Sequence, residues 1–179
     1  MKALSIVYLG TRQAGCIGLL TLQASGCRVR GVVAYDEQVR VVAEALGIRV
    51  LRSIRGADFE ELIRDSDLLV CVHGREIVPA QLLSLPRYGG INVHPCLSSY
   101  PGAHPVERFV RDGNSRASVG VHRMTERVDQ GEMLVEEFIN VTGKCTAEEV
   151  YNVLYPWYAV ALLKALERIR QEACQSSFV

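Results

Sequence analysis

Short apolar runs alternate with amphipathic stretches along the first two thirds of the chain. The apolar runs contain few polar positions, and the stretches between them place apolar residues three or four positions apart. Such runs are typical of parallel strands buried on both faces, and such spacing is typical of helices. We therefore expect strands at residues 3–9, 28–34, 48–51, 67–72 and 90–93.

Helices are expected between these strands, at residues 14–25, 36–46 and 58–64, and a further helix is expected to begin at Pro79. Proline is tolerated at a first helical position because the missing N–H would have no helical partner there. Strands alternating with helices predict an α/β fold, with a doubly wound, mostly parallel open sheet and helices on both faces. Ligands in this Rossmann-like architecture bind outside the carboxyl ends of the strands.

The pattern changes beyond residue 100. A helix is expected at residues 105–112, and two strands at 117–124 and 133–141 should form a β-hairpin near the C-terminus. The segment that joins these strands contains turn residues, so the hairpin should close through it.

A long final helix is expected to follow the hairpin and to reach about Cys174. Thr146 and Glu149 have the spacing of a capping box at its start. Pro156 lies inside this helix, and we expect it to kink or split the helix there because proline lacks the N–H of the helical hydrogen bond.

Length and composition indicate one globular unit, so we expect a single domain over residues 1–179. Basic and acidic residues balance at 20 each, which leaves no electrostatic footprint for nucleic acid and weighs against a tRNA substrate. No apolar run reaches the roughly 18 residues of a membrane span. The six cysteines are scattered without CxxC pairing. Free thiols in a reducing cytosol are the simplest account of them, and we expect a cytoplasmic protein.

Asn92 and His94 end an apolar run and are separated by one residue, so both side chains should leave the strand on the same side. Pro95 keeps His94 extended and ends the strand with the imidazole ring presented forward. An amide and an imidazole together can hold a developing oxyanion. The alternative is a histidine bonded to a backbone carbonyl and an asparagine that turns the chain, and the pair alone does not decide between them.

Asp129 lies about 35 residues later, in an Asp-Gln-Gly turn between the two hairpin strands. A carboxylate beside an imidazole can set its protonation and collect a proton, which suits acyl transfer. Taken alone, however, Asp-x-Gly is a common turn. Only an approach to His94 would give Asp129 a chemical role.

Other polar residues give weaker signals. The glycines after the first strand match neither GxGxxG nor a Walker motif, although Arg12 beside them could meet a phosphate. Residues 73–76 follow a buried strand and would line a pocket shared with the next strand. His104 and Glu107 could be a metal pair, but no third ligand has the right spacing, so we expect no metal. His122 is expected on a strand face.

At the residues 90–134 the sequence resembles the formyltransferases that use 10-formyltetrahydrofolate. This family shows Asn-x-His, a loop, a helix, and a strand that leads to an Asp-x-Gly turn. Here these parts read INVHPCLSSYPGAHP, RFVRDGN and SVGVHRMTERVDQGEML. The resemblance runs from the first strand to about Glu136. Within the family, the sequence looks closest to the sugar N-formyltransferases.

The resemblance implies a mechanism and a set of site residues. The catalytic residues would be Asn92, His94 and Asp129, with the first two stabilising the oxyanion and the third moving the proton of the amine. 10-Formyltetrahydrofolate would be the formyl donor. Its binding residues would be Glu76, Ile77, Val78, Thr125, Glu126, Arg127, Val128 and Asp129.

The loop at residues 97–102 departs from the family pattern, because the usual Leu-Pro-x-Tyr-Arg-Gly reads Leu-Ser-Ser-Tyr-Pro-Gly here. The family's arginine and first proline are missing, which bears on acceptor recognition. After the final helix we expect no room for the second, β-rich domain that the tRNA enzymes and several sugar enzymes carry. A compact acceptor, or help from a partner subunit, is therefore expected.

The expected function is transfer of a formyl group to a primary amine of a small acceptor, an amino sugar of a nucleotide sugar. Two alternatives stay open. The first is hydrolysis of 10-formyltetrahydrofolate, with water in place of the amine, and the second is a non-catalytic folate- or nucleotide-binding module of the same fold. A homodimer is also open, because the apolar faces of the final helix and the hairpin could be either core or interface.

Overall fold

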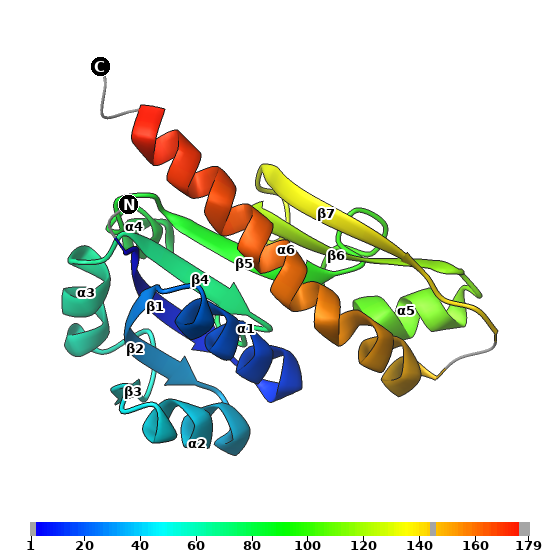
Figure 1. Cartoon of the computed structure of the whole chain (residues 1–179), viewed down its shortest axis with the longest axis horizontal. Helices are drawn as coiled ribbons and strands as arrows, with labels where there is room; N and C mark the ends of the chain where they lie inside the picture. The colour runs from blue at the N-terminus through cyan, green and yellow to red at the C-terminus, as the bar shows by residue number, and fades with distance from the viewer. Residues whose placement is uncertain (1–2, 144–145, 176–179) are drawn as a thin grey trace.

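The computed structural model describes residues 3–143 and 146–175, and these build one seven-stranded sheet with helices around it (Figure 1). The strands are β1 (Ser5–Gly10), β2 (Arg28–Ala34), β3 (Val50–Leu51), β4 (Leu68–Val72), β5 (Gly90–Pro95), β6 (Arg116–Arg123) and β7 (Met133–Asn140). The helices are α1 (Arg12–Ala24), α2 (Glu37–Ala45), α3 (Ala57–Arg64), α4 (Ala80–Leu83), α5 (Pro105–Arg111) and α6 (Ala147–Gln175).

The strand order is β3-β2-β1-β4-β5-β6-β7. The strands β1 to β5 are parallel, and β6 and β7 are added antiparallel at one edge. The doubly wound, mostly parallel sheet with a C-terminal hairpin is therefore confirmed. The chain first winds outward from β1 to β3 and then continues on the other side of β1 with β4. The strand order thus reverses between β1 and β4, which is the position where ligands bind in such sheets.

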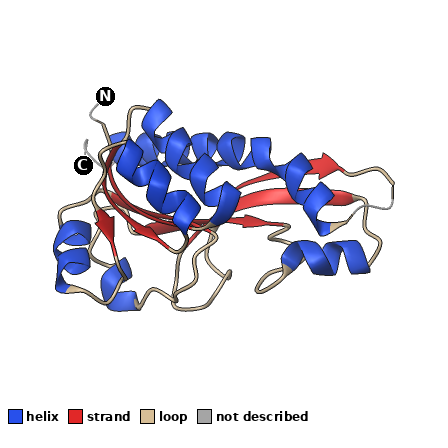
Figure 2. Ribbon diagram, turned by 90° about the horizontal axis from the view of Figure 1, so that it is seen from below, coloured by secondary structure: helices blue, strands red, loops and turns tan. Residues whose placement is uncertain are grey.

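Helices lie on both faces of the sheet (Figure 2), and an apolar layer packs between the sheet and the helices on each face. On one face, alternate residues of the strands such as Ile6, Val70 and Ile91 pack with residues of α1, α2 and α6. On the other face, the intervening residues such as Leu69 pack with α3 and α4. Because side chains alternate along a strand, the polar residues Asn92 and His94 of β5 face the side opposite to that of Ile91. This alternation brings the candidate residues of β5 to the α3–α4 side.

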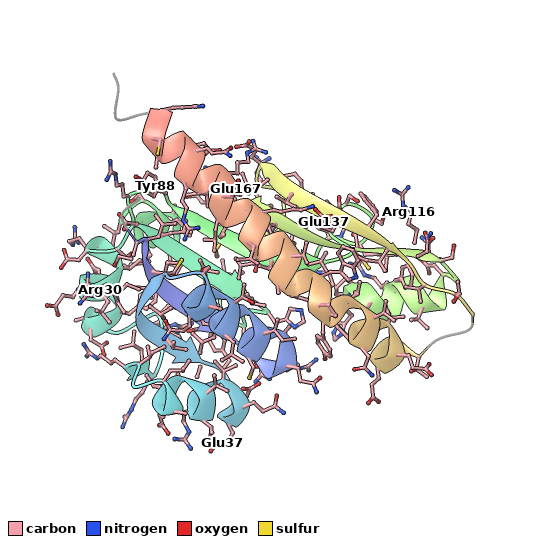
Figure 3. The ribbon with its side chains drawn as sticks, viewed as in Figure 1. Arg30, Glu37, Tyr88, Arg116, Glu137 and Glu167 are labelled. Carbon is pink, nitrogen blue, oxygen red and sulfur yellow. The ribbon has the colours of Figure 1, made fainter. Side chains whose placement is uncertain are left out.

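Helix α6 runs diagonally across the sheet (Figure 1). The capping box at its start is confirmed, since Thr146 Oγ1 accepts from Glu149 N at 3.2 Å and Glu149 Oε2 accepts from Thr146 N at 2.7 Å. Lys164 of α6 donates to Glu137 of β7 at 2.7 Å. Glu137 is labelled in Figure 3, on the strand beside α6. Although α6 is long, no helix within the described ranges is both long and apolar enough to cross a membrane.

Two prolines lie at or within the expected helices. Pro156 lies inside α6 without splitting it, since one helix spans both sides of the proline. The buried residues Leu154 and Tyr158 on either side hold the helix to the sheet, and this packing outweighs the lost hydrogen bond. Pro79 precedes α4 as its N-cap instead of occupying the first helical position.

Candidate active site

Strand β5 presents Asn92 and His94 on one side of the sheet, as their spacing predicts. In the register of the sheet, Asn92 lies beside Cys71 of β4 and His122 of β6. His122 is buried, and its Nε2 lies 3.2 Å from Asn92 Nδ2 while its Nδ1 lies 2.8 Å from the carbonyl oxygen of Arg123. His122 does lie on a strand face, and this face is the one that carries the candidate residues.

The loop between β6 and β7 brings Asp129 to these residues. Its Oδ2 lies 3.2 Å from His94 Nε2, and its Oδ1 lies 3.3 Å from His122 Nε2 and 3.4 Å from Asn92 Nδ2. Only 5% of the Asp129 side chain is exposed. The turn needs glycine at position 131, because a Cβ there would lie 1.7 Å from the carbonyl oxygen of Arg123. The structure thus brings Asn92, His94 and Asp129 together.

The altered loop at residues 97–102 closes over this cluster. Gly102 donates its N–H to Asp129 Oδ2 at 2.7 Å, and its carbonyl oxygen lies 3.1 Å from His94 Nε2. The start of the loop is fixed by Glu136 of β7, whose Oε1 accepts from Ser98 N at 3.1 Å and Ser98 Oγ at 3.0 Å. These contacts position the loop without the proline and the arginine of the family pattern.

The carboxyl group of Asp129 is an anion at neutral pH. Burial raises its pKa, but the hydrogen bond with His122, the nearby His94 and the N–H of Gly102 outweigh this effect and lower the pKa to about 2. Burial lowers the pKa of His94, and the Asp129 carboxylate opposes that shift without cancelling it. His94 is therefore mostly neutral at neutral pH.

The hydrogen bonds of His94 identify its tautomer. Nε2 faces two acceptors, the carbonyl oxygen of Gly102 and the carboxylate of Asp129, so Nε2 carries the proton of the neutral ring. Nδ1 of His94 and Oδ1 of Asn92 are both buried and have no hydrogen-bond partner within the described residues. Buried polar atoms are rarely left without partners, so this pair indicates that a ligand completes the site.

A cavity of about 410 Å³ opens beside the cluster. One wall contains most of the residues that the sequence assigns to the formyl donor. They are Glu76, Ile77, Val78, Thr125, Arg127, Val128 and Asp129. Glu126 is the exception, because it does not line the cavity. Ser53 Oγ donates a hydrogen bond to the Glu76 carboxylate at 3.1 Å, which connects this wall to the loop after β3.

A second wall lies at the reversal of strand order between β1 and β4. It is lined by Thr11, Arg12, His73, His104, Pro105 and Tyr151. His73 bonds to Tyr158 of α6, with 2.5 Å between Nε2 and Oη. No group of three His, Cys, Asp or Glu residues in the described part of the chain is arranged to hold a metal ion. His104 and Glu107 therefore have no third ligand beside them among the described residues.

Sequence reasoning assigned no site role to His122, Tyr151 or Tyr158. His122 directly follows Gly120 and Val121 in β6, and its place in the site could have been found by pairing β6 with β5 in register. Tyr151 and Tyr158 follow the helical spacing of a core face, and nothing local distinguishes them from packing residues. Their place in the site depends on how α6 lies across the sheet.

Comparisons with known proteins point to one family. The family model described as Formyl transferase matches residues 13–166. The methionyl-tRNA formyltransferase of Pelotomaculum thermopropionicum is 30% identical, over 93% of this chain and 58% of its own length. The methionyl-tRNA formyltransferase of Geobacter metallireducens is also 30% identical, over 95% of this chain and 60% of its own length. The chain thus spans about three fifths of these curated relatives.

Solved structures share the fold at lower sequence identity. The phosphoribosylglycinamide formyltransferase of Anaplasma phagocytophilum has a TM-score of 0.82 and 20% identity, covering 96% of this chain and 89% of that one. A formyltetrahydrofolate deformylase of Pseudomonas syringae has a TM-score of 0.81 and 20% identity, covering 95% of this chain and 62% of that one. From the match to its family model, the chain belongs to the formyl transferase family.

Proposed function

We propose that the protein transfers a formyl group from 10-formyltetrahydrofolate to a primary amine of a small acceptor, and that this acceptor is an amino sugar of a nucleotide sugar. The observation that carries the proposal is the contact of Asp129 with His94 and Asn92 at the edge of a cavity. The unpartnered acceptors of the site, Asn92 Oδ1 and His94 Nδ1, support it, because the N–H groups of a bound amine supply hydrogen-bond donors for them.

Asn92 and His94 hold the formyl oxygen in the proposed reaction. The acceptor nitrogen forms a bond to the formyl carbon, and the carbonyl electron pair moves to the oxygen. In the protonated form of His94, which the Asp129 carboxylate favours, Nδ1 carries a second proton and donates it to this oxygen, while Asn92 donates from its amide nitrogen. Both hydrogen bonds are strongest when the oxygen carries its full charge, so they favour the transition state over the bound substrate. When the carbonyl re-forms, the bond from the formyl carbon to N10 of the folate breaks.

Asp129 moves the proton in the same reaction. The amine loses one proton as the new C–N bond forms, and the Asp129 carboxylate receives it, through a water molecule where the two do not touch. The proton then passes to N10 of the departing tetrahydrofolate. A carboxyl group with a pKa of about 2 does not retain a proton at neutral pH, so Asp129 relays the proton and returns to its anionic form.

The donor side of the cavity suits a flat, largely apolar ring. Ile77 and Val128 lie on its rim with 71% and 55% of their surfaces exposed. Apolar side chains exposed at the mouth of a pocket commonly mark a binding surface. We assign the wall formed by residues 76–78 and by the loop at residues 125–129 to the folate.

The acceptor side of the cavity suits a polar and anionic molecule. The Arg12 guanidinium forms no ion pair with any described residue, and Arg12 lines the cavity at the N-terminal end of α1. A helix N-terminus and a free guanidinium both favour an anion. A phosphate group of a nucleotide sugar would meet this wall while its amine reaches the cluster.

Two alternative reactions would use the same residues. Hydrolysis would place water where the amine attacks and would release formate, and the fold is shared with formyltetrahydrofolate deformylases. Transfer to a tRNA-bound amine is the activity named for the similar methionyl-tRNA formyltransferases. The balance of 20 basic and 20 acidic residues argues against a polyanionic acceptor.

Calorimetry with 5-formyltetrahydrofolate, a stable stand-in for the donor, tests the folate side. We expect the wild type to bind with a Kd of about 1 µM or tighter, which is about −8 kcal/mol. Asp129→Asn should weaken binding about tenfold, because Gly102 and His94 lose a charged partner. Asp65→Asn is the matched control, since Asp65 is exposed at the end of α3, and it should bind as the wild type does. A folded wild type that gives no binding heat at about 1 mM ligand would refute the donor assignment.

A further inference from the structure

His73 occupies an unusual position in the second wall of the cavity. It directly follows β4, with a backbone φ of 57°, in the left-handed region. Its ring lies edge-on against two tyrosines of α6, with 5.9 Å between ring centroids to Tyr151 and 5.3 Å to Tyr158. Left-handed backbone at a residue that is not glycine is uncommon, and it persists where surrounding contacts hold it. The two tyrosine rings and a hydrogen bond therefore fix the orientation of this imidazole.

The hydrogen bond to Tyr158 determines which ring nitrogen of His73 carries the proton. Tyr158 is almost wholly buried, and the only hydrogen bond of its hydroxyl within the described residues goes to His73 Nε2. A buried O–H that donates to nothing is costly. The hydroxyl therefore donates to Nε2, and the proton of the neutral imidazole lies on Nδ1.

His73 stays neutral in the physiological range. Burial, together with the nearby His94 and Arg12, lowers its pKa to about 4. Nδ1 makes no hydrogen bond within the described part of the chain, while His73 lines the cavity. The second wall thus offers an uncharged, oriented N–H donor. Such a donor matches a neutral oxygen, whereas Arg12 beside it matches an anion.

His73 lies close to the place where the amine would react. His73 directly follows Val72 of β4, and Val72 pairs with Val93 of β5, the residue before His94. His94 also lowers the pKa of His73. An amine that reacts beside His94 therefore places its neighbouring atoms near His73. In an amino sugar, the carbon next to the amine carries a hydroxyl group.

We propose that His73 determines acceptor specificity by donating its Nδ1–H to a hydroxyl oxygen on the carbon next to the reacting amine. Tyr158 is a positioning residue in this proposal, because it fixes the ring and the tautomer without touching the acceptor. The proposal rests on the proposed formyl transfer, and it adds the chemical feature by which the enzyme chooses among amines.

The test compares two acceptors. A panel of nucleotide-linked amino sugars and simple amino sugars is first screened with 10-formyltetrahydrofolate and the wild type. The best acceptor is then paired with its analogue that lacks the neighbouring hydroxyl. For the wild type we expect kcat/KM to favour the hydroxylated acceptor about tenfold, the value of one hydrogen bond to a buried donor.

His73→Phe should remove this preference by lowering kcat/KM about tenfold for the hydroxylated acceptor while leaving the analogue within about twofold. Tyr158→Phe should reduce the preference in the same direction. Tyr155→Phe is its matched control, because Tyr155 lies on the same helix and stacks on Tyr151 without a hydrogen bond to His73, and it should keep the preference. Binding of 5-formyltetrahydrofolate should be unchanged in all three variants.

Three results would overturn the inference. Equal losses for both acceptors in His73→Phe would show a structural role, and an unchanged preference would show that another group reads the hydroxyl. If His73→Phe does not fold, Tyr158→Phe decides between the same results. If the wild type binds 5-formyltetrahydrofolate and formylates no amine, the proposed transfer is wrong, and the specificity inference falls with it.

Discussion

Asp129 joins side chains and backbone from separate parts of the chain at one carboxylate. It contacts His94 and Asn92 of β5, His122 of β6 and the N–H of Gly102. Its pKa is lowered to about 2 from an ordinary value of 3.8, so its contribution to stability is present above about pH 3.8 and is lost as the pH falls through 2. The cluster therefore keeps its charge and its contacts throughout the range in which an enzyme of this kind works.

His73 should make the protein less stable in mild acid. Its folded-state pKa of about 4 lies below the ordinary value of 6.5, so from about pH 6.5 downward the unfolded chain binds a proton that the folded chain does not. The free energy of unfolding should fall by on the order of 2 kcal/mol more in the wild type than in His73→Phe between about pH 7 and pH 4.

Urea unfolding at a series of pH values measures this difference. The comparison between the two proteins removes the effect of every other titrating group that they share. Parallel curves of unfolding free energy against pH would contradict the buried, neutral state of His73.

Spacing along one strand could be predicted from the sequence, and contacts between distant segments could not. Asn92 and His94 were expected on one side of a strand, because side chains alternate, and the structure has them there. The contact of Asp129 with His94 depends on the path of the β6–β7 loop. The bond of His73 to Tyr158, 85 positions apart, depends on where α6 crosses the sheet, and no local pattern encodes that crossing.

Among the elements, the strands lie where the sequence predicts them, with β3 shorter than expected, and the capped start of α6 is confirmed, because these signals are local. Period-two and helical spacing, and the capping box of α6, involve residues within one element. At Pro156 a kink or a split was expected, and the split does not occur. Helix α6 continues because the packing of a long helix on the sheet outweighs one missing hydrogen bond.

Replacing Pro156 with alanine should stabilise the protein. Pro156 is exposed, so alanine restores a backbone N–H for the helix and relieves the ring without leaving a cavity. The unfolded chain gains freedom with alanine, which offsets part of the benefit. We expect the free energy of unfolding to rise by about 1–2 kcal/mol, as measured by urea denaturation.

Gln171→Ala is the control for this change, because Gln171 is an exposed residue of the same helix and should alter stability by less than about 0.5 kcal/mol. A Pro156→Ala variant no more stable than the wild type would mean that α6 is shaped around the proline ring.

At the scale of the whole molecule, the sheet topology decides where chemistry is possible. The carboxyl ends of β1, β4 and β5 meet beside the reversal of strand order, and the cavity lies there. The antiparallel hairpin then brings Asp129 back to the same edge. The segment after β4 contributes to both walls, the loop between β6 and β7 completes one of them, and the residues after β1 complete the other. In the proposed function, the first wall receives the folate and the second receives the acceptor.

The measurement that tests the central claim most directly is formyl transfer from 10-formyltetrahydrofolate to an amine panel, with formylated amine and free formate quantified together. The wild type should formylate a small amino sugar, and formate should not accumulate in its place. His94→Ala and Asp129→Asn should each lower turnover by about 10² to 10⁴, while Asp65→Asn should retain it.

Methionyl-tRNA is included in the panel and should be a poor acceptor, given the balanced charge of the chain. Formate released at the same rate with and without amine would identify a hydrolase instead. Near-normal turnover in either His94→Ala or Asp129→Asn would contradict the account, because the proposed reaction depends on both side chains.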